Sequence, residues 1–107
     1  MKVQRLKKKK EFTRVLKNGK RAYAETLTIA YLPAEETKVA VCVGKKYGKS
    51  VQRNRIKRLL REAFRVSPAI NTPCLILLIP KVAEEYSFAS FKRDIGKIFK
   101  REKLVET

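Results

Sequence analysis

The sequence predicts an α+β fold, arranged as an α/β sandwich of helices packed on a sheet. Apolar residues recur at helical spacing in three segments, residues 9–17, 51–66 and 87–99. Three other segments, residues 27–32, 38–44 and 74–79, are rich in strand-forming residues and are bounded by turn-forming ones. The resulting order of a helix, two strands, a helix, a strand and a helix is typical of this class.

Length and composition indicate one folded, strongly basic domain. The chain has 107 residues, which suits a single domain spanning residues 1–107. It carries 27 Lys and Arg against 10 Asp and Glu, a net charge of +17, yet 44% of its residues are hydrophobic. A disordered basic tail would lack that apolar share, so we expect a folded protein whose positive field attracts polyanions. No segment has the length of a membrane span or the pattern of a secretion signal, so we expect a cytoplasmic protein with no membrane partner.

The first predicted helix, residues 9–17, is followed by two predicted strands. Its apolar residues fall on one helical face: Phe12, Val15 and Leu16. The dipeptide Asn18-Gly19 then supplies a stop signal. Because only the turn-like residues 33–37 separate segments 27–32 and 38–44, these two strands are predicted to pair antiparallel. In the second strand the three valines face one way, and Ala40, Cys42 and Gly44 face the other.

The second predicted helix begins after Ser50, whose hydroxyl can cap its first turn, and ends at Ser67-Pro68. One side of it is apolar and should pack on the sheet: Ile56, Leu59, Leu60, Ala63 and Phe64. The opposite side collects Asn54, Lys57, Arg58, Arg61 and Arg65. Only Glu62 offsets this charge, and a same-sign stripe of this density predicts a negatively charged partner.

The last strand and helix complete the predicted sandwich. Residues 74–79 form an almost unbroken apolar run between prolines, which predicts a central strand buried on both faces. The final helix starts near Ser87 and has an apolar stripe: Phe88, Phe91, Ile95, Ile98 and Phe99. Cys42 and Cys74 each lie in an apolar run, and the chain has no histidine, so we expect two buried, reduced thiols and no metal site.

The segment 44–58, GKKYGKSVQRNRIKR, allows two interpretations. Gly44, Gly48, Lys49 and Ser50 partly match a nucleotide-binding P-loop, but only three residues separate the glycines where that motif needs four. A basic surface is the better interpretation, and no small-molecule substrate is expected. Lys45, Lys46, Lys49 and Arg53 surround the start of a helix, where free N–H groups and the helix dipole already favour phosphate.

Residues 45–65, KKYGKSVQRNRIKRLLREAFR, strongly resemble the RNR signature of the protein subunit of bacterial ribonuclease P. The Arg53-Asn54-Arg55 core lies eight residues past Lys45-Lys46, as in the family pattern. The resemblance covers nearly the whole chain, including KVAVCVGKK at 38–46 and CLILLIPK at 74–81.

The resemblance implies a protein cofactor of a catalytic RNA that removes the 5′ leader from precursor tRNA. The protein would then carry no catalytic residue, and Mg²⁺ would be bound by the RNA. The implied fold is that of ribosomal protein S5 domain 2, with a left-handed βαβ crossover that general topology rules do not favour.

The family's site residues can be transferred to matching positions of this chain. Those implied to bind the RNA subunit are Lys45, Lys46, Arg53, Asn54, Arg55, Lys57, Arg58 and Arg61, to which charge and position add Lys49 and Arg65. Phe12 matches an aromatic residue of a leader-binding cleft between the first helix and the sheet. Leu16 and Ala30 stand at cleft positions where relatives often have aromatic residues, which predicts weaker stacking on bases.

Two other function classes fit part of the sequence. A non-catalytic RNA- or DNA-binding module, for example a ribosomal one, would account equally well for the charge. A self-sufficient nuclease is disfavoured because the chain lacks histidine, and its acidic doublets at 35–36 and 84–85 are better explained as solvated loop residues. Phe12 also has an alternative role as a core residue that anchors the first helix.

Overall fold

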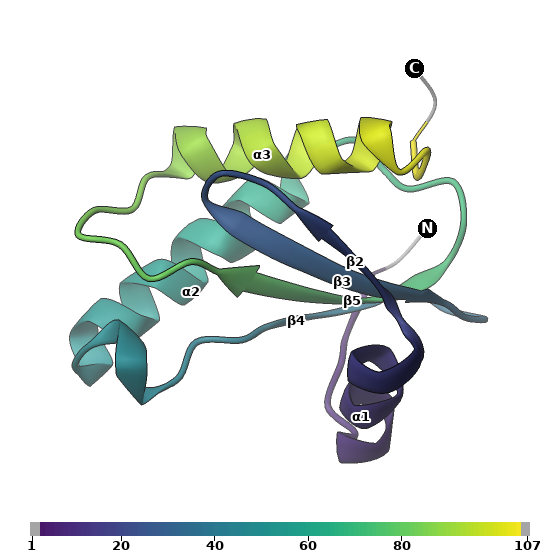
Figure 1. Ribbon diagram of the computed structural model, residues 1–107, viewed down its shortest axis with the longest axis horizontal. Coiled ribbons are helices and arrows are strands. Elements are labelled where there is room, and N and C mark those ends of the chain that lie inside the picture. The colour runs from purple at the N-terminus through teal and green to yellow at the C-terminus, as the bar shows by residue number, and fades with distance from the viewer. Residues whose placement is uncertain (1–2, 106–107) are drawn as a thin grey trace.

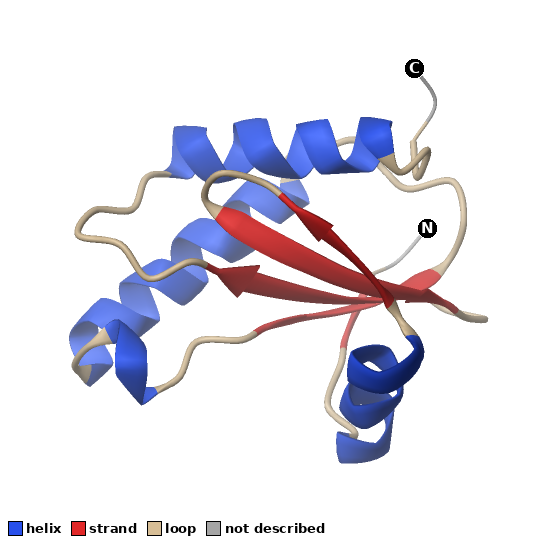
Figure 2. Cartoon of the chain, in the orientation of Figure 1, coloured by secondary structure: helices blue, strands red, loops and turns tan. Residues whose placement is uncertain are grey.

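A computed structural model describes residues 3–105 as three α-helices, one 3₁₀ helix and one five-stranded sheet (Figures 1 and 2). The elements in chain order are β1 (Gln4–Arg5), α1 (Lys9–Asn18), β2 (Lys20–Tyr23), β3 (Leu27–Pro33), β4 (Lys38–Val41), η1 (Lys45–Tyr47), α2 (Ser50–Arg65), β5 (Cys74–Pro80) and α3 (Phe88–Arg101). The predicted α+β class is confirmed, as are all three predicted helices. None of the helices within this range is long and apolar enough to cross a bilayer.

The sheet has the strand order β1-β4-β5-β3-β2, so the predicted pairing of β3 with β4 is wrong. β5 lies between them, antiparallel to β3 and parallel to β4, and in this central position its apolar side chains are covered on both faces of the sheet. β3 forms its hairpin with β2 instead, a strand that the sequence patterns did not indicate. α2 connects the parallel neighbours β4 and β5 and so forms the expected crossover unit, whose left-handed sense stays a prediction.

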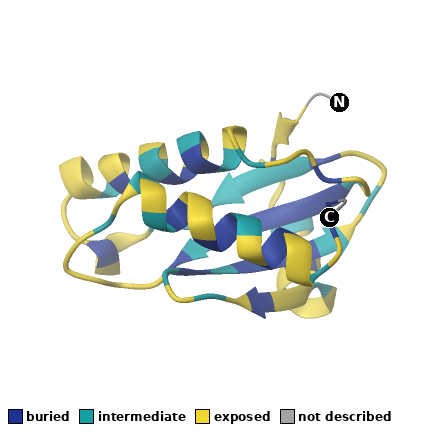
Figure 3. Ribbon diagram, turned by 90° about the horizontal axis from the view of Figure 1, so that it is seen from above, coloured by how far each residue is buried: buried dark blue, intermediate teal, exposed yellow. Residues whose placement is uncertain are grey.

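Side chains of β5 alternate between two cores, as predicted for a central strand. Cys74, Ile76 and Leu78 pack on the side covered by α2 and α3. Leu75 and Leu77 pack on the other side, where α1 contributes Val15. Figure 3 shows the buried residues concentrated on the central strands and on the inward sides of the helices. Burying one such side chain stabilises the fold by about 1.5–3 kcal/mol, so β5 fixes both helix layers.

Both cysteines are free thiols. Cys74 is buried, as predicted, whereas Cys42 is only half-buried because α1 covers that face of the sheet incompletely. Burial raises the pKa of both thiols, which keeps them protonated near neutral pH. Val39, Val41 and Val43 pack on the α2 and α3 side, and Ala40 and Cys42 on the α1 side, which confirms the predicted alternation.

A close backbone approach holds α1 to the sheet. A Cβ atom at Gly19 would lie 2.4 Å from the Val15 carbonyl oxygen and 2.9 Å from that of Tyr31. Only glycine therefore fits where α1 ends and turns into β2.

Two carboxylates attach α3 to the β2–β3 hairpin. Asp94 is 1% exposed and accepts hydrogen bonds from the Thr26 hydroxyl at 2.6 Å and the Thr26 N–H at 2.8 Å. Burial alone would raise the pKa of Asp94, but hydrogen bonds from Arg93 and Thr26 outweigh burial and lower it. At the far end of α3, the hydrogen bond from Tyr31 and the ion pair with Lys20 lower the pKa of Glu102.

The Asp94 contacts predict a specific loss of stability in acid. Because the pKa of Asp94 is lowered on folding, its contribution is present above the unfolded value of about 3.9 and is lost as pH falls through the folded value. Asp94→Asn should lower the free energy of unfolding at neutral pH by about 1–3 kcal/mol and flatten the acid side of the curve. Denaturant titrations between neutral and acidic pH measure both effects.

Glu84→Gln supplies the matched control. Glu84 is exposed and forms no ion pair with any residue from 3 to 105, so this variant removes one charge and leaves every ion pair in place. Equal changes in the two stability curves would show that Asp94 acts only through net charge.

Candidate nucleic-acid interface

α2 buries one side and presents cations on the rest of its surface. Ile56, Leu60 and Ala63 are buried, and α2 packs mainly against α3, where the Phe64 and Phe99 rings meet edge to face at 6.1 Å. The six cations of α2 are Arg53, Arg55, Lys57, Arg58, Arg61 and Arg65. Its single acid, Glu62, forms no ion pair within the described part of the chain.

The α2 cations form no ion pair with any of residues 3–105. Arg53 donates to the Ser50 hydroxyl at 3.1 Å, and the other five make no side-chain hydrogen bond or ion pair there. Arg53 is half-buried and its Nε atom has no acceptor, whereas Asn54 and Arg55 are exposed. Unpaired like charges three and four positions apart repel one another, so an anionic partner would relieve a repulsion that the fold tolerates.

The loop before α2 presents three more cations. Tyr47 of η1 is 7% exposed, and its hydroxyl donates to the Pro80 carbonyl, which ties the loop to the end of β5. Lys46 lies over the Tyr47 ring, with Nζ 5.4 Å from its centroid. Lys45 and Lys49 are exposed beside it. The loop is therefore anchored by its one buried aromatic residue while its lysines face solvent.

The start of α2 differs from the prediction in one respect. Lys49 is the N-cap residue, and Ser50 is already helical and makes no capping hydrogen bond, so the predicted Ser50 cap is wrong. Its hydroxyl instead accepts from Arg53. The first intrahelical bond runs from the Arg53 N–H to the Lys49 carbonyl, so the N–H groups before it are free to bind an anion.

The two loop glycines play different roles. Gly48 has φ +113°, a conformation that favours glycine, and so permits the turn into α2. Gly44 has an ordinary φ of −104°, and a side chain there would meet nothing within 4 Å. The backbone therefore favours glycine at Gly48 and not at Gly44.

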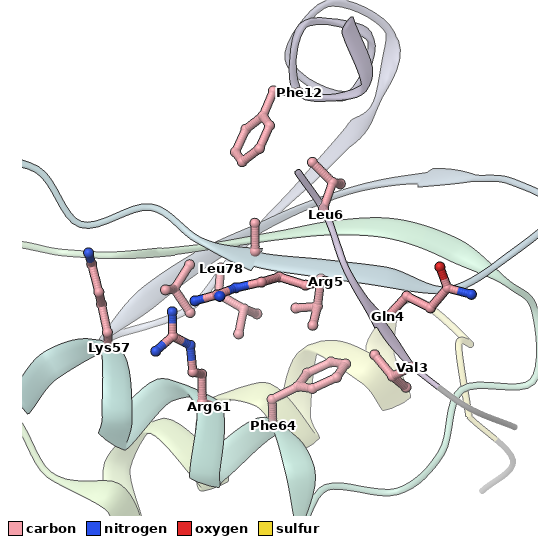
Figure 4. A pocket seen from close by; sticks show the side chains of 12 residues that line it. Val3, Gln4, Arg5, Leu6, Phe12, Lys57, Arg61, Phe64 and Leu78 are labelled. Carbon is pink, nitrogen blue, oxygen red and sulfur yellow. The ribbon is translucent and has the colours of Figure 1, made fainter. Parts of the chain in front are cut away.

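A cleft of 580 Å³ lies between α1 and α2 at the β4 edge of the sheet (Figure 4). Its floor is apolar and consists of Val39, Ala40, Val41 and Leu78. Phe12 projects from α1 on one side, and Lys57, Arg61 and Phe64 project from α2 on the other. The third side is β1 with its neighbours, residues Val3, Gln4, Arg5 and Leu6. The cleft thus combines an aromatic ring, an apolar floor and several cations.

Arg5, Lys57 and Arg61 converge on this cleft, and no carboxylate lines it. None of the three forms an ion pair with any residue from 3 to 105. An apolar floor beside unpaired cations matches single-stranded nucleic acid, whose bases are flat and apolar and whose phosphates are charged.

The predicted basic residues lie on two flanks of α2. Lys57 and Arg61 line the cleft facing α1. Arg55 lines a different hollow, of 400 Å³, together with Lys46 and Tyr86. Arg58 is exposed, and Arg65 is exposed beside the loop that follows α2. The structure thus divides the basic stripe predicted from the sequence into two parts. We call the side of α2 with Lys57 and Arg61 the cleft flank, and the side where Arg55 lies beside the preceding loop the loop flank.

The three predicted cleft residues occupy different environments. Phe12 is half-buried and lines the cleft. Leu16 is 46% exposed and lies one turn further along α1, outside the residues that line the cleft. Ala30 has no exposed surface because Val15, Leu75 and Leu77 enclose it beneath α1, so the prediction that Ala30 lines the cleft requires correction.

Sequence patterns did not identify Arg5, Gln4 and Phe64 as cleft residues. β1 is only two residues long, too short to show an alternating pattern, and Arg5 lies in a generally basic segment. The sequence pattern places Phe64 on the apolar side of α2, but its half-buried ring both packs against Phe99 in a T-shaped pair and lines the cleft. Their role depends on β1 pairing with β4, which no local signal predicts.

On the described surface, no site suited to hydrolytic chemistry is evident. Between residues 3 and 105, no three Asp, Glu, His or Cys side chains lie together as a metal-binding group. What the geometry supports is binding of a polyanion, through the cations and the apolar floor of the cleft.

Comparisons with known proteins identify the same family at the levels of sequence and fold. The family described as Ribonuclease P matches residues 1–103. The ribonuclease P protein component of Chlamydia trachomatis serovar L2 is 38% identical over 85% of this chain and 78% of its own length. The component from Caldanaerobacter subterraneus is 36% identical over 98% of this chain and 94% of its own. The structure of Staphylococcus aureus RNase P protein superposes with a TM-score of 0.82 at 25% identity, covering 98% of this chain and all of that one.

Arg61→Ala should weaken binding of single-stranded RNA while leaving the fold intact. Arg61 has no ionic partner among the described residues, and its removal relieves repulsion by Arg58 and Arg65, so the melting temperature should stay unchanged or rise slightly. The slope of log affinity against log salt should become shallower by about 0.7 for each phosphate that the variant no longer neutralises. Fluorescence anisotropy over a salt series measures this slope.

Lys92→Ala removes an exposed cation of α3 that forms no ion pair with residues 3–105, and it serves as the control. An equal change of slope in both variants would mean that RNA responds to net charge and not to the cleft.

Proposed function

The chain belongs to the ribonuclease P protein family, whose members are subunits of an endoribonuclease, and from this premise we propose that it binds both the catalytic RNA and the precursor tRNA leader. Family membership implies partnership with the ribonuclease P RNA. Binding of the 5′ leader, and the residues that perform it, are inferred from the geometry. A cytoplasmic location accords with this activity.

The observation that carries the proposal is the carboxylate-free cleft between α1 and α2. Lys57 and Arg61 supply charge for phosphates, and Phe12 supplies a ring on which a base can stack. Stacking of one base on an aromatic side chain contributes about 1–3 kcal/mol and is tolerant of sequence. Tolerance of this kind suits a leader, because each precursor tRNA carries a different one.

The loop flank of α2 is the proposed contact with the catalytic RNA. Lys45, Lys46 and Lys49 surround the free N–H groups at the start of α2, and Arg55 and Arg58 extend this charge along the helix. A folded RNA presents many phosphates at fixed positions, which a rigid helix end can match. The two flanks would hold the two RNAs on either side of one helix.

The protein's proposed contribution to catalysis is positioning. Holding the leader beside the catalytic RNA converts part of the substrate encounter into an intramolecular event, which lowers the barrier without any protein group touching the reacting phosphate. We assign Mg²⁺ to the RNA, as the family resemblance implies, where it would activate water and stabilise the leaving oxygen.

Reconstitution tests the function directly. The purified chain is mixed with a bacterial ribonuclease P RNA and precursor tRNA at a magnesium concentration too low for the RNA alone. We expect correct 5′ cleavage to be restored, since the cations of the protein replace part of the charge screening and its cleft holds the leader. RNA binding without restored cleavage would favour the alternative, a non-catalytic RNA-binding module.

Two substitutions separate the two proposed flanks. Phe12→Ala should weaken binding of precursor tRNA to the assembled holoenzyme by about 1–3 kcal/mol, with no effect on mature tRNA, because only the leader stacks on Phe12. Arg58→Ala should weaken assembly with the catalytic RNA whichever tRNA is supplied. Affinities for both tRNA forms and for the RNA subunit distinguish these outcomes.

Phe12 also packs against the α1 core, so its removal needs a control for folding. Phe12→Leu keeps most of the apolar volume and removes the ring, and melting temperatures are measured for both variants. If Phe12→Leu binds precursor tRNA like the parent and Phe12→Ala mainly lowers the melting temperature, Phe12 is a core residue and the leader assignment is wrong.

A further inference from the structure

A second groove continues the cleft along the side of α2. It has a volume of 340 Å³ and is lined by residues from the end of α2 and the loop that follows it, including Arg65, Pro68 and Ile70. Val3 and Phe64 line both this groove and the cleft, so the two hollows meet at these residues. Figure 4 shows Val3 and Phe64 side by side at the edge of the cleft, beyond Arg5 and Arg61.

The charge of the cleft and the second groove together distinguishes them from the other hollows described. Neither the cleft nor the second groove is lined by an aspartate or glutamate, and Arg65 stands on the second groove as Arg61 stands on the cleft. Each of the three other hollows described is lined by at least one glutamate. The chain has ten acidic residues, yet none of them lines the cleft or the second groove, which follow one another along β1 and α2. Of the hollows described, these two therefore favour a phosphate backbone.

Phe64 gives this path a second aromatic surface. Its ring is half-buried and is held edge to face by Phe99, so little side-chain freedom remains to be lost when a base stacks on it. Its position at the junction means that a strand stacked on Phe64 would run from the cleft into the second groove.

Strand β1 adds a free backbone edge beside Phe64. The N–H groups of Gln4 and Leu6 donate to the carbonyls of Thr37 and Val39. Because alternate residues of a strand point their N–H and C=O groups to opposite edges, those of Arg5 point away from β4. The edge therefore offers hydrogen-bonding groups together with the Arg5 guanidinium.

We propose that the groove beyond Phe64 is a second subsite for single-stranded RNA and holds leader nucleotides further from the cleavage site than those in the cleft. This proposal rests on the leader-binding function proposed above. The order of the subsites follows from α2, since the loop flank assigned to the catalytic RNA lies at its start and the groove lies about 24 Å away at its end. A leader leaving the catalytic RNA would reach the cleft first.

Val3→Glu tests the second subsite, and Val66→Glu is its matched control. The two valines are 45% and 48% exposed, and both variants add one negative charge to an exposed position near the end of α2. Val3 lies where the two hollows meet, whereas Val66 lines neither. Each variant is assembled with the catalytic RNA, and its affinity is measured for precursor tRNAs whose leaders are extended one nucleotide at a time.

With the parent protein we expect affinity to rise with leader length and then to reach a plateau. Val3→Glu should reach its plateau at a shorter leader and should bind long leaders at least about fivefold more weakly, the amount expected when one base no longer stacks. Val66→Glu should follow the parent curve. Phe64→Leu, which keeps an apolar side chain against Phe99, should likewise make the affinity reach its plateau at a shorter leader.

Two other outcomes would overturn the proposal, and they are distinguishable. If Val3→Glu and Val66→Glu follow the same curve while the parent still prefers leaders, the second subsite is wrong and the cleft assignment stands. If the parent binds mature and precursor tRNA equally well, leader binding itself is wrong and the second subsite fails with it. Melting temperatures of all variants confirm that each comparison is made between folded proteins.

Discussion

The burial of β5 on both faces is the constraint on which the rest of the structure depends. Its side chains alternate between two apolar layers, so the strand must be central and must be covered by helices on each side. β5 therefore separates β3 from β4, although those two strands are neighbours in sequence. α2 and α3 cover one layer and α1 covers part of the other. The cleft lies where these two covers end, at the β4 edge.

The distribution of the few acidic residues matters as much as the large number of basic ones. Glu11, Glu25 and Glu102 form ion pairs that attach α1 and α3 to their surroundings, and Asp94 accepts hydrogen bonds from Thr26 of the β2–β3 hairpin. The α2 cations form no ion pair within residues 3–105, and no acid lines the cleft. The charge on α2 thus contributes little to stability and remains available to an external polyanion. Function and stability draw on different sets of charged residues.

The burial of Ala30 changes how aromatic residues contribute to the cleft. Ala30 has no exposed surface and is buried in one cluster with Val15 of α1. A larger side chain would have to displace α1 or emerge beside it. In this chain the rings that border the cleft are instead those of Phe12 and Phe64, which come from two helices on opposite sides of it.

The sequence by itself determined the three helices, the central apolar strand and the basic face of α2. These features are local, because helical spacing, an apolar run or a motif such as Arg53-Asn54-Arg55 is complete within one segment. Its resemblance to a known family also indicated the fold and the RNA partner.

Only the tertiary structure decided which strands pair, how the α2 cations divide between two flanks, and that Arg5 and Phe64 border the cleft. β1 and β2 are short edge strands defined by their neighbours, and their positions follow from the burial of β5 rather than from their own residues. Pairings between distant segments depend on the free energy of the whole core, which no single stretch of sequence contains.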